Sequence, residues 1–319
     1  MEAWAQLPNE SPNAPRNERP MSTVWHVAPE HGSEAVMRLV AWLALRLGRR
    51  ATRWLLYPMS LYFLVFAPRA RRASRAFLDR ALQRKAGAAD VLRNFFTYAA
   101  TLHDRIYLLC GRFEYLDVSV DGAPQVEAIL ARGRGCILLG SHLGSFEALR
   151  VLGGVNTRYP INIVMYEGAT QKVSGVLNSL APELKARVIA PGRPDTMLRI
   201  QECLERGEIV GILGDRPFGS EKSTLCSFLG VPARFPHGPF RLAMALEAPV
   251  VLFFGLYLGG NRYRICLEVL AERADAERGE RAEAAARWVE RYARRLEYFA
   301  RAAPYNWFNF YDFWHEGLR

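Results

Sequence analysis

The sequence has few of the residues from which metal centres and disulfide frameworks are built. Its five cysteines stand singly, and none belongs to a Cys-x-x-Cys pair; they are Cys110, Cys136, Cys203, Cys226 and Cys266. Its six histidines show no metal-ligand spacing. These absences give no support to a zinc knuckle or a disulfide scaffold. We therefore expect a reducing compartment, no bound metal and no cofactor.

Long apolar runs are missing as well. The run Trp54–Ala67 has 14 residues, and a helix of that length reaches ~21 Å, which is less than the ~30 Å of a bilayer core. Residues 1–20 are polar, contain four prolines and lack the basic start and apolar centre of a secretory signal. We predict no single transmembrane helix, and we interpret residues 1–20 as a flexible extension.

Acidic residues are scarce in one segment, and the charge of the whole chain is concentrated there. The formal net charge is +10. Between Val36 and Arg93 stand 13 Lys or Arg against two acids, a surplus of 13 − 2 = +11, while the rest of the chain is close to neutral. Two apolar runs, Val36–Leu47 and Trp54–Ala67, alternate with these charges. A basic segment of this kind favours an anionic partner.

The pattern of residues 21–89 is typical of helices that lie in a membrane interface. Aromatic side chains such as Trp54, Tyr57 and Tyr62 suit the headgroup level, and arginines suit lipid phosphates. The alternative is a helical cap that packs its apolar face on the main domain. Nucleic acid is a weaker candidate, because the aromatics stand within Leu-rich runs instead of among polar residues. We predict peripheral or monotopic attachment to the cytoplasmic face of the inner membrane.

From Asp90 onward the sequence alternates between strand and helix patterns. Short apolar runs such as Gly135–Gly140 and Glu208–Leu213 are typical of buried parallel strands. Further strands are expected at Phe113–Val120, Ile161–Tyr166, Arg187–Ala190, Pro249–Leu258 and Tyr263–Leu270, and helices at Val91–Leu109, Gln125–Arg132, Ser145–Leu152, Val173–Leu180, Asp195–Glu205 and Glu280–Ala302. Alternation of this kind predicts an α/β domain over residues 90–319, with a mostly parallel or mixed central sheet flanked by helices.

The residues after Gly140 are the first candidates for catalysis. His142 follows a strand end, where ligands bind in open α/β sheets. Glu147 could orient the imidazole and leave the second ring nitrogen free to take a proton. No serine stands where a Gly-x-Ser-x-Gly elbow needs it. The pair therefore suits deprotonation of a substrate hydroxyl or amine; the alternative is a histidine that merely satisfies a local carboxylate.

Two further segments are candidates for substrate binding. Asp215 and Arg216 follow the strand that ends at Leu213, so they emerge at the same sheet edge. Arg216 could bind a phosphate or stabilise an oxyanion, with Asp215 positioning it, or the two could form a simple turn. The segment Ser227–Pro239 is rich in turn residues yet apolar, like a loop lining an apolar slot. Its candidate residues are Phe235, His237 and Gly238, and simple loop packing is the alternative.

From Val36 onward, these segments together resemble the late acyltransferases of lipid A biosynthesis, a lauroyl and myristoyl transferase family similar to glycerolipid acyltransferases. The resembling motifs are His142-x-x-x-x-Glu147, Gly214-Asp215-Arg216, Phe228–Ala233, and Pro304-Tyr305-Asn306-Trp307. The resemblance implies a membrane enzyme that moves an acyl chain from an acyl carrier protein or coenzyme A thioester to a lipid acceptor. His142 and Glu147 match its catalytic signature. The alternatives are a thioester hydrolase and a non-catalytic lipid-binding protein.

One position departs from that family. After the strand Ile161–Met165 the family commonly has Tyr-Arg, whereas this sequence has Tyr166-Glu167. A carboxylate beside an acceptor site repels phosphate. We therefore expect an acceptor that is neutral or cationic near Glu167, and the acceptor stays open between a lipid A precursor, a lysophospholipid, an aminoacyl lipid and another anchored product.

Overall fold

The computed structural model describes residues 34–149, 159–165, 187–217, 221–274 and 279–316. Three of the expectations above lie outside these ranges. They concern the extension at residues 1–20, the helix at Val173–Leu180, and Glu167.

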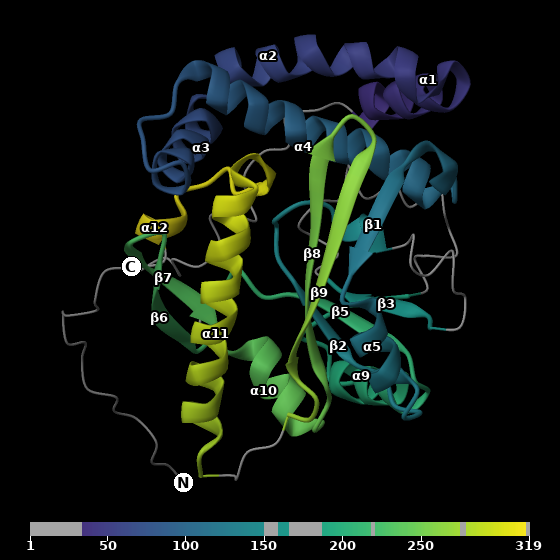
Figure 1. The fold of residues 1–319 in the computed structure, drawn as a ribbon, viewed down its shortest axis with the longest axis vertical. Coiled ribbons are helices and arrows are strands. Elements are labelled where there is room, and N and C mark those ends of the chain that lie inside the picture. The colour runs from purple at the N-terminus through teal and green to yellow at the C-terminus, as the bar shows by residue number, and fades with distance from the viewer. Residues whose placement is uncertain (1–33, 150–158, 166–186, 218–220, 275–278, 317–319) are drawn as a thin grey trace, which may run out of the picture.

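A seven-stranded sheet forms the centre of the molecule, in the order β1-β9-β8-β2-β5-β3-β4 (Figure 1). Its strands are β1 (Asp117–Asp121), β2 (Ile137–Gly140), β3 (Ile161–Val164), β4 (Val188–Ile189), β5 (Ile209–Leu213), β8 (Val250–Gly259) and β9 (Arg262–Ala271). Neighbouring strands are parallel except for the β8–β9 hairpin. The predicted α/β class with a mostly parallel sheet is therefore confirmed.

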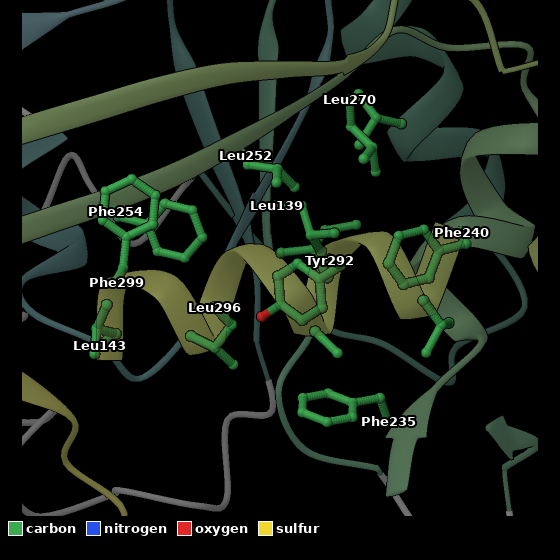
Figure 2. Close-up of a cluster of buried hydrophobic side chains, with 14 of the residues drawn as sticks. Leu139, Leu143, Phe235, Phe240, Leu252, Phe254, Leu270, Tyr292, Leu296 and Phe299 are labelled. Atoms are coloured by element: carbon green, nitrogen blue, oxygen red, sulfur yellow. The ribbon is translucent and has the colours of Figure 1, made fainter. Parts of the chain in front are cut away.

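Both faces of the sheet are buried. Successive side chains of a strand point to opposite sides, so each strand contributes to the hydrophobic clusters on both faces. Leu139 of β2 and Leu252 of β8 belong to one hydrophobic cluster, and Leu138 belongs to another. The first face is covered by α10 (Gly238–Ala245) and α11 (Arg281–Ala302), and the second by α4 (Ala88–Leu109) and α5 (Ala123–Leu130). Figure 2 shows Tyr292 of α11 beside Leu139, with Leu296 farther along the same helix.

α11 is helical for the reason its sequence suggests. It is rich in Ala, Glu and Arg, which are good helix formers. Its buried residues recur every three or four positions, so they form one face toward the sheet; they are Ala284, Ala285, Val289, Tyr292, Ala293, Leu296, Phe299 and Ala300. The helix α9 (Thr196–Glu205) lies between β4 and β5 in the chain and contributes Ile200 and Leu204 to the first cluster.

The basic N-terminal segment forms helices at one end of the molecule (Figure 1). They are α1 (Glu34–Thr52), the 3-10 turn η1 (Arg53–Leu55), α2 (Leu56–Phe66) and α3 (Pro68–Ala81). In Figure 1, α1 and α2 lie above α4, and α3 lies to one side of it. Within the described ranges, no helix combines the length and the apolar character that crossing a bilayer requires.

Two local expectations were wrong. The segment Ser227–Pro239 is not a loop: most of it belongs to the antiparallel hairpin of β6 (Ser223–Phe228) and β7 (Val231–Pro236), whose two-residue turn contains Gly230. The strand expected from Phe113 begins only at Asp117, because Phe113–Tyr115 forms a 3-10 turn, η2. In both cases a turn and a strand share one apolar stretch, which periodicity alone does not separate.

Candidate functional site

The candidate site lies where two adjacent parallel strands end. β2 pairs with β5 so that Gly140 is opposite Leu213, the last residue of each strand. His142 and Asp215 each follow two residues later, and the strand register therefore brings them together. The imidazole Nδ1 of His142 lies 2.8 Å from Oδ1 of Asp215. Asp215 was expected at this sheet edge, and the structure places it in direct contact with the histidine.

Asp215 is fully buried and is held by three hydrogen-bond donors. Besides the imidazole, the backbone N–H of His142 donates to Oδ2 at 3.0 Å, and the indole Nε1–H of Trp307 donates to the same oxygen at 3.3 Å. Burial alone would raise the pKa of Asp215, but His142 and Arg216 outweigh it and lower the pKa to about 2. Asp215 is therefore a carboxylate at neutral pH.

This carboxylate fixes the tautomer of His142. A carboxylate only accepts hydrogen bonds, so Nδ1 of the imidazole carries the proton and Nε2 has the free lone pair. Burial, followed by the positive charge of Arg216, lowers the pKa of His142 below its usual 6.5. The side chain is nevertheless 29% exposed. His142 is thus a neutral base at pH 7 that a substrate can reach.

The loop that carries His142 packs closely against the sheet at two glycines, Gly144 and Gly211. Gly144 has a φ of +78°, and a Cβ there would meet the carbonyl oxygen of Gly255 at 2.0 Å, so only glycine fits. The ring of Phe146, in the 3-10 turn η3 (Phe146–Ala148), packs over Gly211, where a Cβ would stand 2.4 Å from the ring. Both glycines let the loop lie directly on the sheet.

The C-terminal segment closes the site from the other side. Gly144 donates its N–H to the carbonyl of Asn306 at 2.7 Å, and Phe308 donates its N–H to the carbonyl of His142 at 2.9 Å. Trp307 is 1% exposed, and its indole reaches Asp215. The sequence singled out this segment only through the Pro-x-x-Trp resemblance and assigned it no role. The sequence did contain one signal for this contact. The indole N–H of a buried tryptophan usually has a hydrogen-bond partner, so Trp307 could have been expected to contact a polar group.

Arg216 lies beside the pair. Its Nη2 donates to the carbonyl of Phe308 at 3.2 Å, and its guanidinium stands 5.1 Å from the centre of the Tyr311 ring. The side chain is partly exposed. A cation held this way, next to His142, can stabilise negative charge on a substrate.

Glu147 does not occupy the place expected for it. Its Oε1 forms an ion pair with Nη2 of Arg105 on α4 at 2.7 Å. Asp215, and not Glu147, is the carboxylate on Nδ1 of His142. The five-residue spacing suggested a local contact, but the left-handed turn at Gly144 and the η3 turn separate the two side chains along the loop. Glu147 instead ties this loop to α4.

The remaining candidates lie on the hairpin side of the molecule. Phe235 is fully buried in the core, with its ring 6.1 Å from that of Tyr292. Nε2 of His237 lies 2.5 Å from Oγ1 of Thr224, and a Cβ on Gly238 would meet the carboxylate of Glu221 at 2.6 Å. Among the described residues, none of the contacts of Phe235, His237 and Gly238 joins them to His142. Their assignment to a substrate slot stays a prediction.

A base with an oriented tautomer and an adjacent cation can remove a proton from a substrate and stabilise the charge that follows. In the described ranges, no cluster of three or more His, Cys, Asp or Glu side chains has the arrangement of a metal site. A search of curated proteins finds no match to the chain. The model of the family described as bacterial lipid A biosynthesis acyltransferase matches residues 27–316, nearly the whole chain. The protein therefore belongs to the bacterial lipid A biosynthesis acyltransferase family, and it is an acyltransferase.

Proposed function

We propose that this enzyme transfers an acyl chain directly from a thioester to a hydroxyl or amine of a lipid, with His142 and Asp215 as its catalytic pair. The thioester is carried by an acyl carrier protein or by coenzyme A. The observation that supports this most is the buried Asp215 carboxylate behind a partly exposed imidazole, 2.8 Å away. That arrangement suits a base acting on a substrate proton without an enzyme nucleophile.

The reaction then follows in two proton transfers. Nε2 of His142 takes the proton of the acceptor hydroxyl or amine as its oxygen or nitrogen attacks the thioester carbonyl. Arg216 stabilises the oxyanion that forms on the carbonyl oxygen, and Asp215 stabilises the imidazolium. When the carbon–sulfur bond breaks, the imidazolium returns the proton to the leaving sulfur. The products are an acylated lipid and a free thiol.

Glu147 has a positioning role in this proposal. Its ion pair with Arg105 connects the loop of His142 to α4, which the Phe308 and Phe310 rings also contact through Tyr98. Its effect on the reaction therefore passes through the placement of His142 and does not involve a proton of the substrate.

We further propose that α1 and α2 hold the enzyme on the cytoplasmic face of an anionic inner membrane. The outer face of α2 is apolar yet exposed to solvent, although an apolar helix in a water-soluble domain is normally covered on all sides. Its exposed residues recur with a period of four: Tyr57, Leu61 and Val65 in one row, and Pro58, Tyr62 and Phe66 in the next. Trp54, 74% exposed, extends this face onto η1.

Exposed arginines stand at both ends of that apolar face, which favours a lipid surface over a protein partner. Arg46 and Arg50 precede it on α1, and Arg69, Arg72 and Arg75 follow it on one side of α3. Each basic residue near an anionic leaflet contributes ~1 kcal/mol of attraction. A bilayer with phosphate groups around an apolar interior is the surface that fits this arrangement.

The lipid acceptor is proposed to be neutral or cationic near Glu167. On this view, Glu167→Arg weakens use of the native acceptor and improves use of a phosphorylated one. Kinetics with both kinds of acceptor that the substitution leaves unchanged would remove this constraint on the acceptor.

A thioester hydrolase is the competing enzyme, with His142 activating water in place of a lipid. The test is thiol release from a long-chain acyl-CoA, and from acyl carrier protein loaded with the same chain, with and without the lipid extract of cells that lack the gene. Transfer requires that thiol release depend on the extract and that mass spectrometry find a new acylated lipid. Equal release of free fatty acid in both conditions would show hydrolysis. A His142→Ala protein that folds and keeps full biological activity would point to lipid binding without catalysis.

A further inference from the structure

One buried amide in the C-terminal segment has no hydrogen-bond partner. Asn309 is 2% exposed, and in the part of the chain that the structure describes neither its Nδ2 nor its Oδ1 makes a hydrogen bond. Leaving a buried polar group unpaired is unfavourable, because the group has lost its hydrogen bonds to water. By contrast, the buried side chains of Asn94, Asn162 and Asn306 all form hydrogen bonds. An unpaired buried amide of this kind indicates that Asn309 forms its hydrogen bond with a bound molecule and not with the protein.

Asn309 stands in the segment that surrounds the catalytic pair. Trp307 donates to Asp215, and the peptide groups of Phe308 contact both His142 and Arg216. The side chains of this segment separate into two sides. The rings of Phe308 and Phe310 both lie 5.2 Å from Tyr98 of α4.

The other side faces the reaction centre. The indole of Trp307 reaches Asp215, and the ring of Tyr311 lies under Arg216. The rings of Phe308 and Phe310 stack with their centroids 6.5 Å apart, so the side chain between them, that of Asn309, points to the opposite side, which it shares with Trp307 and Tyr311. Its amide therefore belongs to the Asp215 and Arg216 side of the segment.

In the loop that carries His142, the four successive N–H groups of residues 142–145 are bonded within the protein and are not free for an oxyanion. They donate, in chain order, to Asp215, Ser141, Asn306 and Gly255. Acyl transfer forms negative charge on the carbonyl oxygen, and enzymes meet it with preorganised donors. A side-chain donor can take the place of these four backbone groups.

We infer that Asn309 is a further catalytic residue, whose Nδ2–H donates to the oxyanion formed on the thioester carbonyl. This inference rests on the proposed acyl transfer. Arg216 supplies charge at that oxygen, and Asn309 supplies a neutral, directed hydrogen bond. Because Asn309 is 2% exposed, the inference requires that its amide become accessible to the carbonyl oxygen when the thioester binds. No atom or charge is exchanged with Asn309 in the reaction.

The test compares Asn309→Leu and Asn309→Asp with the wild-type enzyme in the thiol-release assay with the lipid extract, using a long-chain acyl-CoA and acyl carrier protein loaded with the same chain as donors. Both variants remove the donor while keeping the size of the side chain. With the donor that the wild type uses, we expect kcat to fall about 10²- to 10³-fold with little change in the KM of the thioester. The free energy of unfolding of Asn309→Leu should stay equal to that of the wild type or exceed it, since no protein hydrogen bond is lost. Asn162→Leu is the control: it loses the bond to Glu208 and should lower stability without a selective loss of kcat.

A wild-type kcat in Asn309→Leu would overturn the inference. A raised KM of Asn309→Leu with an unchanged kcat would also overturn it, because this result means that Asn309 binds the ground state and the transition state equally. A loss of stability equal to that of Asn162→Leu would also overturn it by assigning the amide a structural role. These outcomes are separable from failure of the proposed function. A wild-type enzyme that only hydrolyses the thioester still forms the oxyanion and still tests Asn309, whereas a wild type that releases no thiol from either donor contradicts acyl transfer itself.

Discussion

The imidazole of His142 and the carboxylate of Asp215 are in contact at 2.8 Å although 73 positions separate them in the chain. The histidine is partly exposed and the aspartate is fully buried. The pair therefore has an inner end, where protein donors surround the carboxylate, and an outer end, Nε2, which carries the free lone pair. In this arrangement Nδ1 stays protonated whether the imidazole is neutral or charged.

The first prediction separates the two candidate partners of His142. Asp215→Asn keeps the shape of the side chain but removes the charge that fixes the tautomer, so we expect thiol release to fall about 10²- to 10⁴-fold. His142→Ala should lose at least as much. Glu147→Gln should lose less, because Glu147 acts through its ion pair with Arg105. Steady-state kinetics of the purified variants, with circular dichroism to verify folding, decide the order. A Glu147→Gln loss that exceeds that of Asp215→Asn would restore Glu147 as the catalytic acid partner.

The second prediction concerns pH. The neutral form of His142 is the base, so activity should rise with pH and level off above a pKa that lies below 6.5. Arg216 is one of the groups that lower this pKa, after burial. Arg216→Gln removes a positive charge, which makes the imidazolium more favourable and raises the pKa. The acidic limb of kcat/KM should therefore move to higher pH. Arg216→Lys keeps the charge and is the control, with its limb unmoved; identical limbs in all three proteins would contradict the assigned cause.

The third prediction tests the membrane face. Trp54→Ser combined with Phe66→Ser removes two exposed apolar side chains, 74% and 64% exposed, from the face on η1 and α2. Co-sedimentation with phosphatidylglycerol-containing vesicles should fall strongly, and the wild-type protein should be released by detergent more readily than by salt. Leu198→Ser, on α9 with 57% exposure, is the matched control and should sediment like the wild type. Unchanged sedimentation of the double variant would place the attachment elsewhere.

The fourth prediction concerns the connection between α1 and the sheet. Nε and Nη2 of Arg49 bond the two carboxylate oxygens of Asp104 at 2.7 and 2.8 Å, and Tyr263 of β9 also donates to Asp104. Both charges are buried. Asp104→Asn leaves the guanidinium without its counter-charge, so the free energy of unfolding should fall by about 3–5 kcal/mol.

The control for this pair is Arg132→Ala, which breaks an exposed ion pair with Glu272 and should cost little. Chemical denaturation, followed by tryptophan fluorescence, measures both variants. A double replacement of Arg49 and Asp104 by Met and Leu should recover much of the loss, because it leaves no unpaired buried charge. Equal stability of Asp104→Asn and Arg132→Ala would show that the buried pair contributes no more than a surface one.

Strand ends were the most predictable part of the site. Gly140 and Leu213 end two apolar runs, and parallel pairing of those runs is enough to place His142 and Asp215 at one edge. The partner of the imidazole was not predictable in the same way, because Glu147 is closer in sequence and its direction depends on the turn at Gly144. Local spacing favoured one carboxylate, and the strand register selected the other.

Contacts between distant segments were the least predictable part. Trp307 reaches Asp215, and Asn306 binds the backbone of Tyr257, through packing that no local pattern encodes. The surroundings of Phe235 were also not predictable from its neighbours in the sequence. An apolar residue near turn residues suggested a loop, yet Phe235 stands in β7, with its ring beside that of Tyr292 in the core. Exposure of apolar side chains depends on neighbouring elements, and these come from the whole chain.

The placement of Trp307 and Phe308 against the His142 loop also bears on the order of events during synthesis. Strand β2 and its loop leave the ribosome long before the segment that supplies the indole and the Phe308 peptide. Domains fold as units while the chain emerges, but Asp215 here gains its third donor, and Arg216 its carbonyl, only when that late segment docks. The helices of residues 34–81 emerge before the strands of the sheet. On the proposed membrane attachment, a nascent chain is held at the lipid surface while it is still inactive, and its reactivity toward thioesters begins only with the last stage of folding.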